Sequence, residues 1–276
     1  MRYQKTILKN GIRLIFVPMP GNPTVTCGIG VNFGSSHETE KNNGIAHFLE
    51  HMCFKGTTNR TRQQIVKEFE GLAVSNNAYT NSDHTFYHFK VAKKGFEKAF
   101  DVLSDMYANS TIPEEELEKE RGVILEEINM YEDNPRRKVY EAFGESMFEG
   151  HPLAMSTLGP KSNIKSFKPK DFLKILEDKY VGAATTVVVA GDLKNSQVIK
   201  LAEEKLGHLK KGKLEKPKKF KSKQKTSNLK IVNKKTDQSH LVLGFRTFNS
   251  QDKDFITLDI LKRIIGSGFG SRLFEK

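Results

Sequence analysis

The chain has 276 residues, 37% of them hydrophobic, enough for a sizeable core in one large domain or in one domain and part of another. No secretory leader pattern opens it and no stretch approaches the roughly 18 apolar residues of a membrane span, so we expect a cytoplasmic protein with no membrane partner. The only two cysteines, Cys27 and Cys53, are too few for a disulfide framework, which agrees with a reducing compartment, and we predict that both are buried thiols. The formal net charge is +12.

The first predicted elements are strands. Asn10-Gly11 separates two apolar runs within residues 6–20, which predicts a hairpin with a two-residue primed turn, and a third apolar run covers residues 24–36. From Gly44 onward the period changes to three and four, which predicts a helix. The apolar residues that follow this helical period are Ile45, Phe48, Leu49 and Met52.

The middle of the chain alternates between helices and strands. We predict helices over residues 61–72, 95–110, 114–133, 135–148, 169–180 and from about 194 to 206, two strands within 73–92, and a buried strand over 185–193. Antiparallel strands with interspersed helices predict an α+β fold, in which a mostly antiparallel sheet packs with helices, and not a doubly wound parallel sheet.

Much of the positive charge lies in the lysine-rich tract 210–225. Such an excess suits nucleic acid or an anionic membrane, but the tract contains little aromatic interleaving. We interpret it as a solvated linker and predict no nucleic-acid partner. The alternative, in which the tract binds nucleic acid, predicts an affinity that falls steeply with salt.

After this tract the pattern of the N-terminus begins again. We predict strands over 229–235 and 240–248 and a helix within 254–270, which repeats the order of strand, strand, acidic turn and helix. A duplicated domain is therefore our interpretation.

Three domain limits follow from this repeat. We expect a first domain over residues 1–210, a basic linker over 211–226 and the beginning of a second, homologous domain over 227–276. A complete second domain of similar size would need well over about 100 further residues, so we expect the chain to be cut short within it.

The segment GIAHFLEHMCFKGT, residues 44–57, places His47, Glu50 and His51 on the first predicted helix. Residues four apart point about 40° from one another, so the two imidazoles can share a zinc ion at nitrogen distances of about 2.0 to 2.1 Å. Glu50 falls on the same face, where its carboxylate can take a proton from an activated water. This H-x-x-E-H arrangement is a zinc-peptidase signature, although the same spacing also arises by chance on amphipathic helices.

A third ligand decides between these readings, because a hydrolytic zinc site normally has three protein ligands and an open position. The acidic helix 114–133 offers candidates. Glu120 and Glu127 are seven residues apart and share one face of this helix. Periodicity does not choose between Glu126 and Glu127.

Four segments in order, HFLEHMCFKGT, NAYT, EKERGVILEEI and HPLAMSTLGPKSNI, resemble the pitrilysin/insulinase family of inverted-motif (HxxEH) zinc peptidases, in the branch of the mitochondrial processing peptidase β subunit and its bacterial relatives. The resemblance runs from residue 3 to residue 276. It implies a processing-peptidase-like metallohydrolase domain and one Zn²⁺ per chain.

The resemblance also implies roles for individual residues. In the family the third ligand is a glutamate well downstream of the second histidine, and Glu127, 76 residues after His51, stands at the matching position. Glu120 matches a family position that supports the site by orienting a histidine ligand. Without the resemblance, Glu120 would be an exposed acid on a charged helix.

Asn77, Ala78 and Tyr79 match the family's edge strand, where the backbone pairs with an extended substrate. The resemblance therefore implies peptides or unfolded segments as substrates. It also implies a homodimer or a complementary subunit as a partner.

Other candidate ligands fit the site less well. His84 and His88 share a strand face, but their side chains are too far apart to chelate one ion, so we predict structural roles. Cys53 points about 200° away from His51 on the helix. His151 resembles a family loop residue and not a ligand.

Two departures from the family carry expectations. One of the two acidic positions that bind a substrate arginine is Arg137 here, while Glu141 keeps the other, so we expect no strong preference for arginine. The family segment whose arginine and tyrosine reach the substrate across a clamshell would lie beyond Lys276. We therefore expect this chain to lack the opposing wall that stabilises the tetrahedral intermediate.

The sequence thus predicts a zinc-dependent endopeptidase. His47, His51 and Glu127 hold the ion, while Glu50 as general base and Glu120 form the rest of the catalytic machinery. The alternative is a non-catalytic or half-enzyme subunit of the same family that needs a partner.

Overall fold

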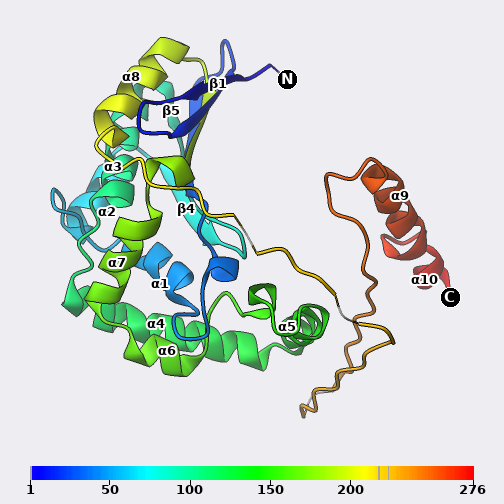
Figure 1. The fold of residues 1–276 in the computed structure, drawn as a ribbon. Helices are drawn as coiled ribbons and strands as arrows, with labels where there is room; N and C mark the ends of the chain where they lie inside the picture. The colour runs from blue at the N-terminus through cyan, green and yellow to red at the C-terminus, as the bar shows by residue number, and fades with distance from the viewer. Residues whose placement is uncertain (1, 217, 223, 236) are drawn as a thin grey trace. The chain divides into compact units, whose positions relative to one another are not determined.

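The structure is a computed structural model that describes residues 2–216, 218–222, 224–235 and 237–276 (Figure 1). The chain divides into two compact units, residues 1–240 and residues 241–276. None of the helices formed by the described residues is long and apolar enough to cross a lipid bilayer.

The first unit contains one six-stranded sheet with the order β1-β2-β6-β3-β5-β4. Neighbouring strands pair antiparallel except for β2 and β6, which are parallel. The predicted α+β class with a mostly antiparallel sheet is therefore confirmed. The strands are β1 (Gln4–Ile7), β2 (Arg13–Pro18), β3 (Thr24–Val31), β4 (Ser75–Thr80), β5 (Thr85–Ala92) and β6 (Thr185–Gly191).

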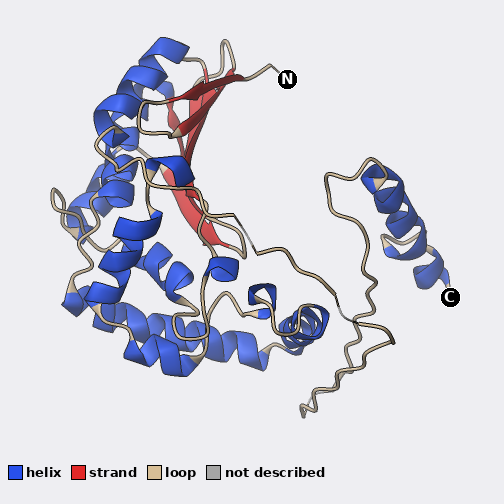
Figure 2. Cartoon of the chain, in the orientation of Figure 1, coloured by secondary structure: helices blue, strands red, loops and turns tan. Residues whose placement is uncertain are grey.

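Helices of the first unit gather on one face of this sheet (Figure 2). Alternate residues of β5 and β6 are buried, because successive side chains of a strand point to opposite faces. The helices are α1 (Ile45–Met52), α2 (Arg62–Gly71), α3 (Phe96–Ala108), α4 (Glu114–Asp133), α5 (Pro135–Met147), α6 (Lys161–Ser166), α7 (Pro169–Lys179) and α8 (Asn195–Leu206). Single 3₁₀ turns lie at Ser35–His37, Lys93–Gly95, Pro152–Ala154 and Gly182–Ala184.

The core lies between the sheet and these helices. Helix α1 is central to it, since its apolar side chains are fully buried and Phe48 makes an edge contact with Phe172 of α7. Burying such large side chains is the main favourable term in folding. The largest fully buried side chains include Phe16, Phe33, Phe48, Tyr87, Phe89, Phe96, Phe100, Tyr107 and Phe172.

The predicted N-terminal hairpin is confirmed, but its turn is not of the two-residue primed type. The strands β1 and β2 pair antiparallel, and the connection between them spans residues 8–12. Gly11 has a φ of 92°, whereas Asn10 stays outside the left-handed region that a type I′ turn requires. The Asn10 amide instead donates to the carbonyl of Leu206 at 2.9 Å, which ties the turn to the end of α8.

The strands predicted over 229–235 and 240–248 are not formed, and the structure describes both segments as loop. A strand needs a neighbour to pair with and a core to cover one face. Leu241, Leu243 and Phe245 are 85%, 78% and 79% exposed, so their apolar pattern has no core here. The predicted helix of the second unit forms as α9 (Phe255–Gly266), followed by α10 (Arg272–Glu275). The predicted domain limits stay a prediction.

Candidate metal centre

Helix α1 begins with its N-terminal amides held by a buried carboxylate. Glu38 is 3% exposed and accepts hydrogen bonds from the backbone N–H of Gly44 at 2.9 Å, from that of Ala46 at 2.7 Å and from the Asn43 amide at 2.8 Å. The negative charge of the ionised Glu38 carboxylate also lies at the positive end of the helix dipole, which attracts it. Gly44 has a φ of 98°, and a Cβ there would lie 2.6 Å from the carbonyl oxygen of Leu158. Only glycine therefore fits at this helix start.

The three polar residues of the motif lie on one face of α1. His47 and Glu50 are 9% and 8% exposed, and His51 is half-buried. The two imidazole rings meet edge to face, with centroids 4.8 Å apart. The predicted helix therefore brings both histidines together.

Glu127 of α4 completes this group. Its Oε2 lies 3.6 Å from Nε2 of His47 and 3.9 Å from Nε2 of His51. Glu126 is exposed and contacts the Asn129 amide on its own helix. Of the two glutamates that periodicity could not separate, the structure places Glu127 beside the histidines.

This arrangement fits a zinc ion. One ligand atom each from His47, His51 and Glu127 lies within 4.8 Å of the others, and this is the one such group among the described residues. Tetrahedral coordination at zinc–ligand distances of about 2.0 to 2.1 Å requires ligand atoms about 3.3 Å apart. Oε2 of Glu127 lies 3.6 and 3.9 Å from the two histidine nitrogens, close to this spacing, and side-chain rotation would close the remaining separations of up to 4.8 Å when an ion binds.

His47 is held in the protonation state that a metal ligand needs. Burial, together with the neighbouring His51, lowers the pKa of His47 to about 3. The ring is therefore neutral near pH 7, and one of its nitrogens keeps a free lone pair.

Glu120 of α4 fixes the tautomer of the second histidine. Its Oε1 lies 2.8 Å from Nδ1 of His51, and its Oε2 forms an ion pair with Lys55. Burial raises the pKa of the Glu120 carboxyl, but the hydrogen bonds from His51 and Lys55 outweigh this and hold the pKa below its ordinary value. Because a carboxylate only accepts, Nδ1 carries the hydrogen and Nε2 offers its lone pair toward Glu127. Glu120 is 7% exposed, which excludes the alternative of an exposed acid.

Glu50 also has a partner outside its helix. Its Oε2 accepts a hydrogen bond of 2.5 Å from the hydroxyl of Thr80 at the end of β4. Burial raises the pKa of the Glu50 carboxyl, and the hydrogen bond from Thr80 partly offsets this. A raised pKa suits a base that takes up a proton and later releases it.

Helix α4 is tied to the rest of the unit by Arg121. Its guanidinium donates to the carbonyl oxygens of Ile164 and Phe167, the latter at 2.8 Å, and lies 5.9 Å from the centre of the Phe48 ring. These contacts hold α4 against α6 and α1. The glutamates of α4 therefore keep their place beside the histidines of α1.

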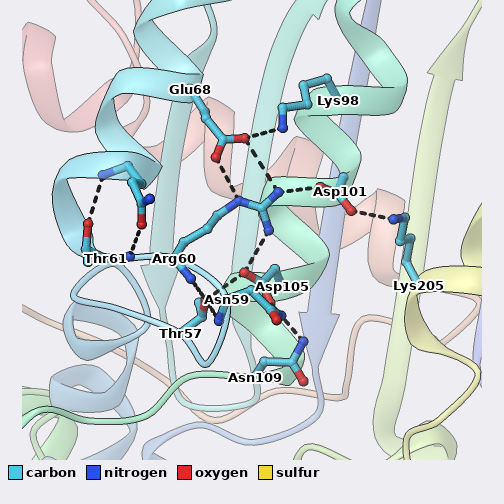
Figure 3. Close-up of polar contacts among 11 residues, drawn as sticks. Thr57, Asn59, Arg60, Thr61, Glu68, Lys98, Asp101, Asp105, Asn109 and Lys205 are labelled. Carbon is cyan, nitrogen blue, oxygen red and sulfur yellow. Dashed lines mark hydrogen bonds and ion pairs between the residues drawn. The ribbon is translucent and has the colours of Figure 1, made fainter.

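The loop after α1 is anchored by a charged cluster (Figure 3). Arg60 is the centre of the cluster and pairs with Asp105 at 2.8 Å, with Glu68 at 3.0 Å and with Asp101. These partners come from α2 and α3, so the cluster joins two helices to the loop. Further hydrogen bonds to Asp105 come from Thr57, Asn59 and Asn109.

The predicted substrate-binding residues lie on β4, the last strand in the order of the sheet. Asn77 and Tyr79 are exposed and Ala78 is half-buried. Through the contact between Thr80 and Glu50, this edge strand lies beside the candidate base.

The residues that the sequence predicts not to be ligands lie outside the group of His47, His51 and Glu127. His84 and His88 contact the ring of Tyr79 and not the metal group. Cys53 is a buried thiol whose pKa burial raises to about 12, and it accepts a hydrogen bond from Tyr87. His151 caps a 3₁₀ turn through its Nδ1.

Cys27 is likewise buried, and this burial raises the pKa of its thiol.

Sequence reasoning missed three residues of the site: Glu38, Lys55 and Thr80. Glu38 stands in a polar stretch that predicts a loop, so its burial had no signal in the sequence. Lys55 and Thr80 stand inside motifs that were recognised, but their partners lie on other elements.

Two family matches cover most of the chain. Residues 13–161 match the family described as Insulinase (Peptidase family M16), and residues 166–276 match the family described as Peptidase M16 inactive domain. A protease from Helicobacter pylori has the same fold, with a TM-score of 0.87 and 26% identity over 99% of this chain and 67% of that chain.

Curated relatives extend this comparison. An uncharacterized zinc protease of Rickettsia felis is 36% identical over 97% of this chain and 65% of the relative. The zinc protease YmxG of Bacillus subtilis is 35% identical over 97% of this chain and 64% of the relative. Mitochondrial-processing peptidase subunit beta of Rattus norvegicus is 34% identical over 96% of this chain and 54% of the relative. The chain therefore spans about 65% of the length of the first two relatives. On these matches and this fold, the chain belongs to the M16 (insulinase) family of peptidases.

Proposed function

We propose that the chain is a zinc-dependent endopeptidase, or the zinc-binding part of one. The observation that carries this proposal is the convergence of Nε2 of His47, Nε2 of His51 and Oε2 of Glu127, with Glu50 on the same helix face. Two nitrogens and one carboxylate oxygen form a known ligand set of hydrolytic zinc sites.

The residues of the chain would divide the reaction among them. When bound, Zn²⁺ supplies the Lewis acidity that activates water for attack on a peptide carbonyl. Glu50 takes the proton of the attacking water and delivers it to the leaving amine. Glu120 keeps the hydrogen of His51 on Nδ1, so that Nε2 stays available as a ligand.

The substrates that fit this site are peptides and unfolded segments. Strand β4 pairs with β5 on one side and ends the sheet on the other, so its outer edge can accept an added strand. A folded protein cannot easily present an extended segment there. Asn77, Ala78 and Tyr79 are the residues that such a strand would pass.

The test is cleavage of a mixed pool of unstructured peptides by the chain, followed by mass spectrometry. We expect the wild type with one zinc to cut, and Glu50→Gln to keep its zinc and lose activity by about 10²-fold or more. Glu126→Gln, which removes an exposed carboxylate one residue from Glu127, is the matched control and should cut like the wild type. Undiminished cleavage by Glu50→Gln would refute the proposed base.

A second candidate function is that of a zinc-binding subunit that needs a second copy or a complementary subunit. It is favoured by the similarity to a relative that is itself named as a subunit, mitochondrial-processing peptidase subunit beta. This alternative predicts stoichiometric zinc without cleavage by the isolated chain, and cleavage once the partner is supplied. A chain that binds no zinc would support a scaffold instead.

A further inference from the structure

The edge strand and the candidate base are joined by one short hydrogen bond. The Thr80 hydroxyl lies 2.5 Å from Oε2 of Glu50, and the two residues come from different elements, β4 and α1. Glu50 is buried and Thr80 is half-buried, so solvent competes little for this contact. Hydrogen bonds to a charged acceptor are about twice as strong as neutral ones.

The hydroxyl of Thr80 is itself held in place. Thr80 and Thr85 are partners in the register of β4 and β5, and their Oγ1 atoms are 3.2 Å apart. Thr85 is fully buried and donates its hydrogen to the carbonyl oxygen of Phe33 at 3.0 Å. Thr85 therefore has no hydrogen left to donate to Thr80. The single hydroxyl hydrogen of Thr80 is directed at Glu50, because the carboxylate oxygen at 2.5 Å is a closer and stronger acceptor than the Thr85 oxygen at 3.2 Å.

Glu50 needs such a partner. The last torsion of a glutamate side chain has a broad energy profile, so packing alone defines the plane of its carboxylate poorly. A hydrogen bond to Oε2 selects one plane and leaves Oε1 as the oxygen that can face the reacting water. Proton transfer depends on this orientation, because donor and acceptor must meet at hydrogen-bond distance.

We propose that Thr80 is a positioning residue that orients the Glu50 carboxylate for proton transfer and links the substrate-binding edge strand to the base. This inference rests on the proposed function, in which Glu50 is the base. Ala78 and Thr80 share the inner face of β4, while Asn77 and Tyr79 point outward. A substrate strand paired along β4 would thereby be held by the same backbone that carries the orienting hydroxyl.

Two variants separate this role from simple packing. Thr80→Val keeps the shape of the side chain and loses the hydroxyl, whereas Thr80→Ser keeps the hydroxyl and loses the methyl group. A positioning role predicts that serine replaces threonine and valine does not. A packing role predicts the opposite order.

The first measurement does not require activity. In the metal-free chain at constant pH, the infrared difference between wild type and Glu50→Gln isolates the carboxylate stretching band of Glu50. For Thr80→Val, the difference is taken against the double variant that also carries Glu50→Gln, and we expect the band to be shifted. For Thr80→Ser, measured in the same way, we expect the band to keep its position. An unshifted band in Thr80→Val would overturn the proposal.

The second measurement is peptide cleavage by the zinc-loaded variants. Thr80→Val should lower kcat about ten-fold or more, with KM and zinc content unchanged, and Thr80→Ser should stay within about two-fold of the wild type. If Glu50→Gln is inactive while Thr80→Val cuts like the wild type, the role of Thr80 is refuted and the base is not. If Glu50→Gln itself cuts like the wild type, the proposed function fails. If the isolated chain does not cut, the position of the infrared band tests the role of Thr80.

Discussion

Nδ1 of His51 donates to Oε1 of Glu120 at 2.8 Å, while Lys55 pairs with the other oxygen of the same carboxylate. The loop residue after α1 thus neutralises the acid that orients a histidine of α1. The buried charge of Glu120 is compensated on both oxygens, which burial of a carboxylate requires.

Removing the charge of Glu120 should weaken zinc binding without removing a ligand. We predict that Glu120→Gln lowers zinc affinity about 10- to 100-fold, because the amide orients His51 less firmly. Competition with a chromogenic chelator measures the change. Glu114→Gln, an exposed acid on the same helix, is the control. Equal affinities of both variants would contradict the orienting role.

Substitutions of the two neighbouring glutamates of α4 should differ in their effect on zinc content. Glu127→Ala removes a predicted ligand, so we expect the zinc content after dialysis to fall well below one per chain. Glu126→Ala should keep one zinc, since Glu126 is exposed and contacts only its own helix in the described part of the chain. Metal analysis by mass spectrometry distinguishes them, and loss of zinc in the second variant would overturn the assignment.

Arg60 should affect the stability of the folded chain and not which residues bind zinc. Arg60→Ala leaves Asp105 and Asp101 without their central partner, and we predict a loss of about 3 kcal/mol in the free energy of unfolding. Arg62→Ala is the matched control, because Arg62 is 54% exposed and reaches Glu116 only at 4.0 Å. Its loss should stay within about 0.5 kcal/mol. Urea titration of both variants measures the difference, and equal losses would refute the anchoring role.

The buried carboxyl of Glu38 should make stability depend on pH. Burial raises the pKa of Glu38 from 4.5 to about 7, against the hydrogen bonds from Ala46, Asn43 and Gly44. Between these values the folded chain holds a proton that the unfolded chain has lost. The free energy of unfolding therefore falls as pH rises from 4.5 to 7, by about 1 to 3 kcal/mol.

Urea titration of the metal-free chain at several pH values measures this slope. Glu38→Gln does not ionise, so this contribution should disappear, whereas Glu40→Gln, an exposed acid nearby, should keep it. An unchanged slope in Glu38→Gln would contradict the prediction.

Substrate preference should show no strong selection for arginine. The Arg137 guanidinium lies 3.6 Å from the centre of the Tyr131 ring, and Glu141 is already paired with Lys138 at 2.6 Å. A substrate arginine would meet one basic group and an acid that has a partner. Cleavage-site profiling with a peptide library tests this, and a profile dominated by arginine at one subsite would disprove it.

Local patterns sufficed for much of this protein. The spacing of His47, Glu50 and His51 predicted that they share a helix face, because helical geometry depends only on neighbouring residues. Alternation and turn residues likewise predicted the strands of the first unit. The same patterns misled at 229–235 and 240–248, which form no strand ladder with any of the described residues.

The tertiary structure decided what depends on contacts between distant segments. Periodicity left Glu126 and Glu127 equivalent, and only the docking of α4 on α1 turns Glu127 toward the histidines. The insertion of β6 between β2 and β3, and the hydrogen bond from Thr80 to Glu50, likewise join segments far apart in the chain. Sequence spacing reports which side chains share a face of one element, whereas the packing of elements against each other determines which faces meet.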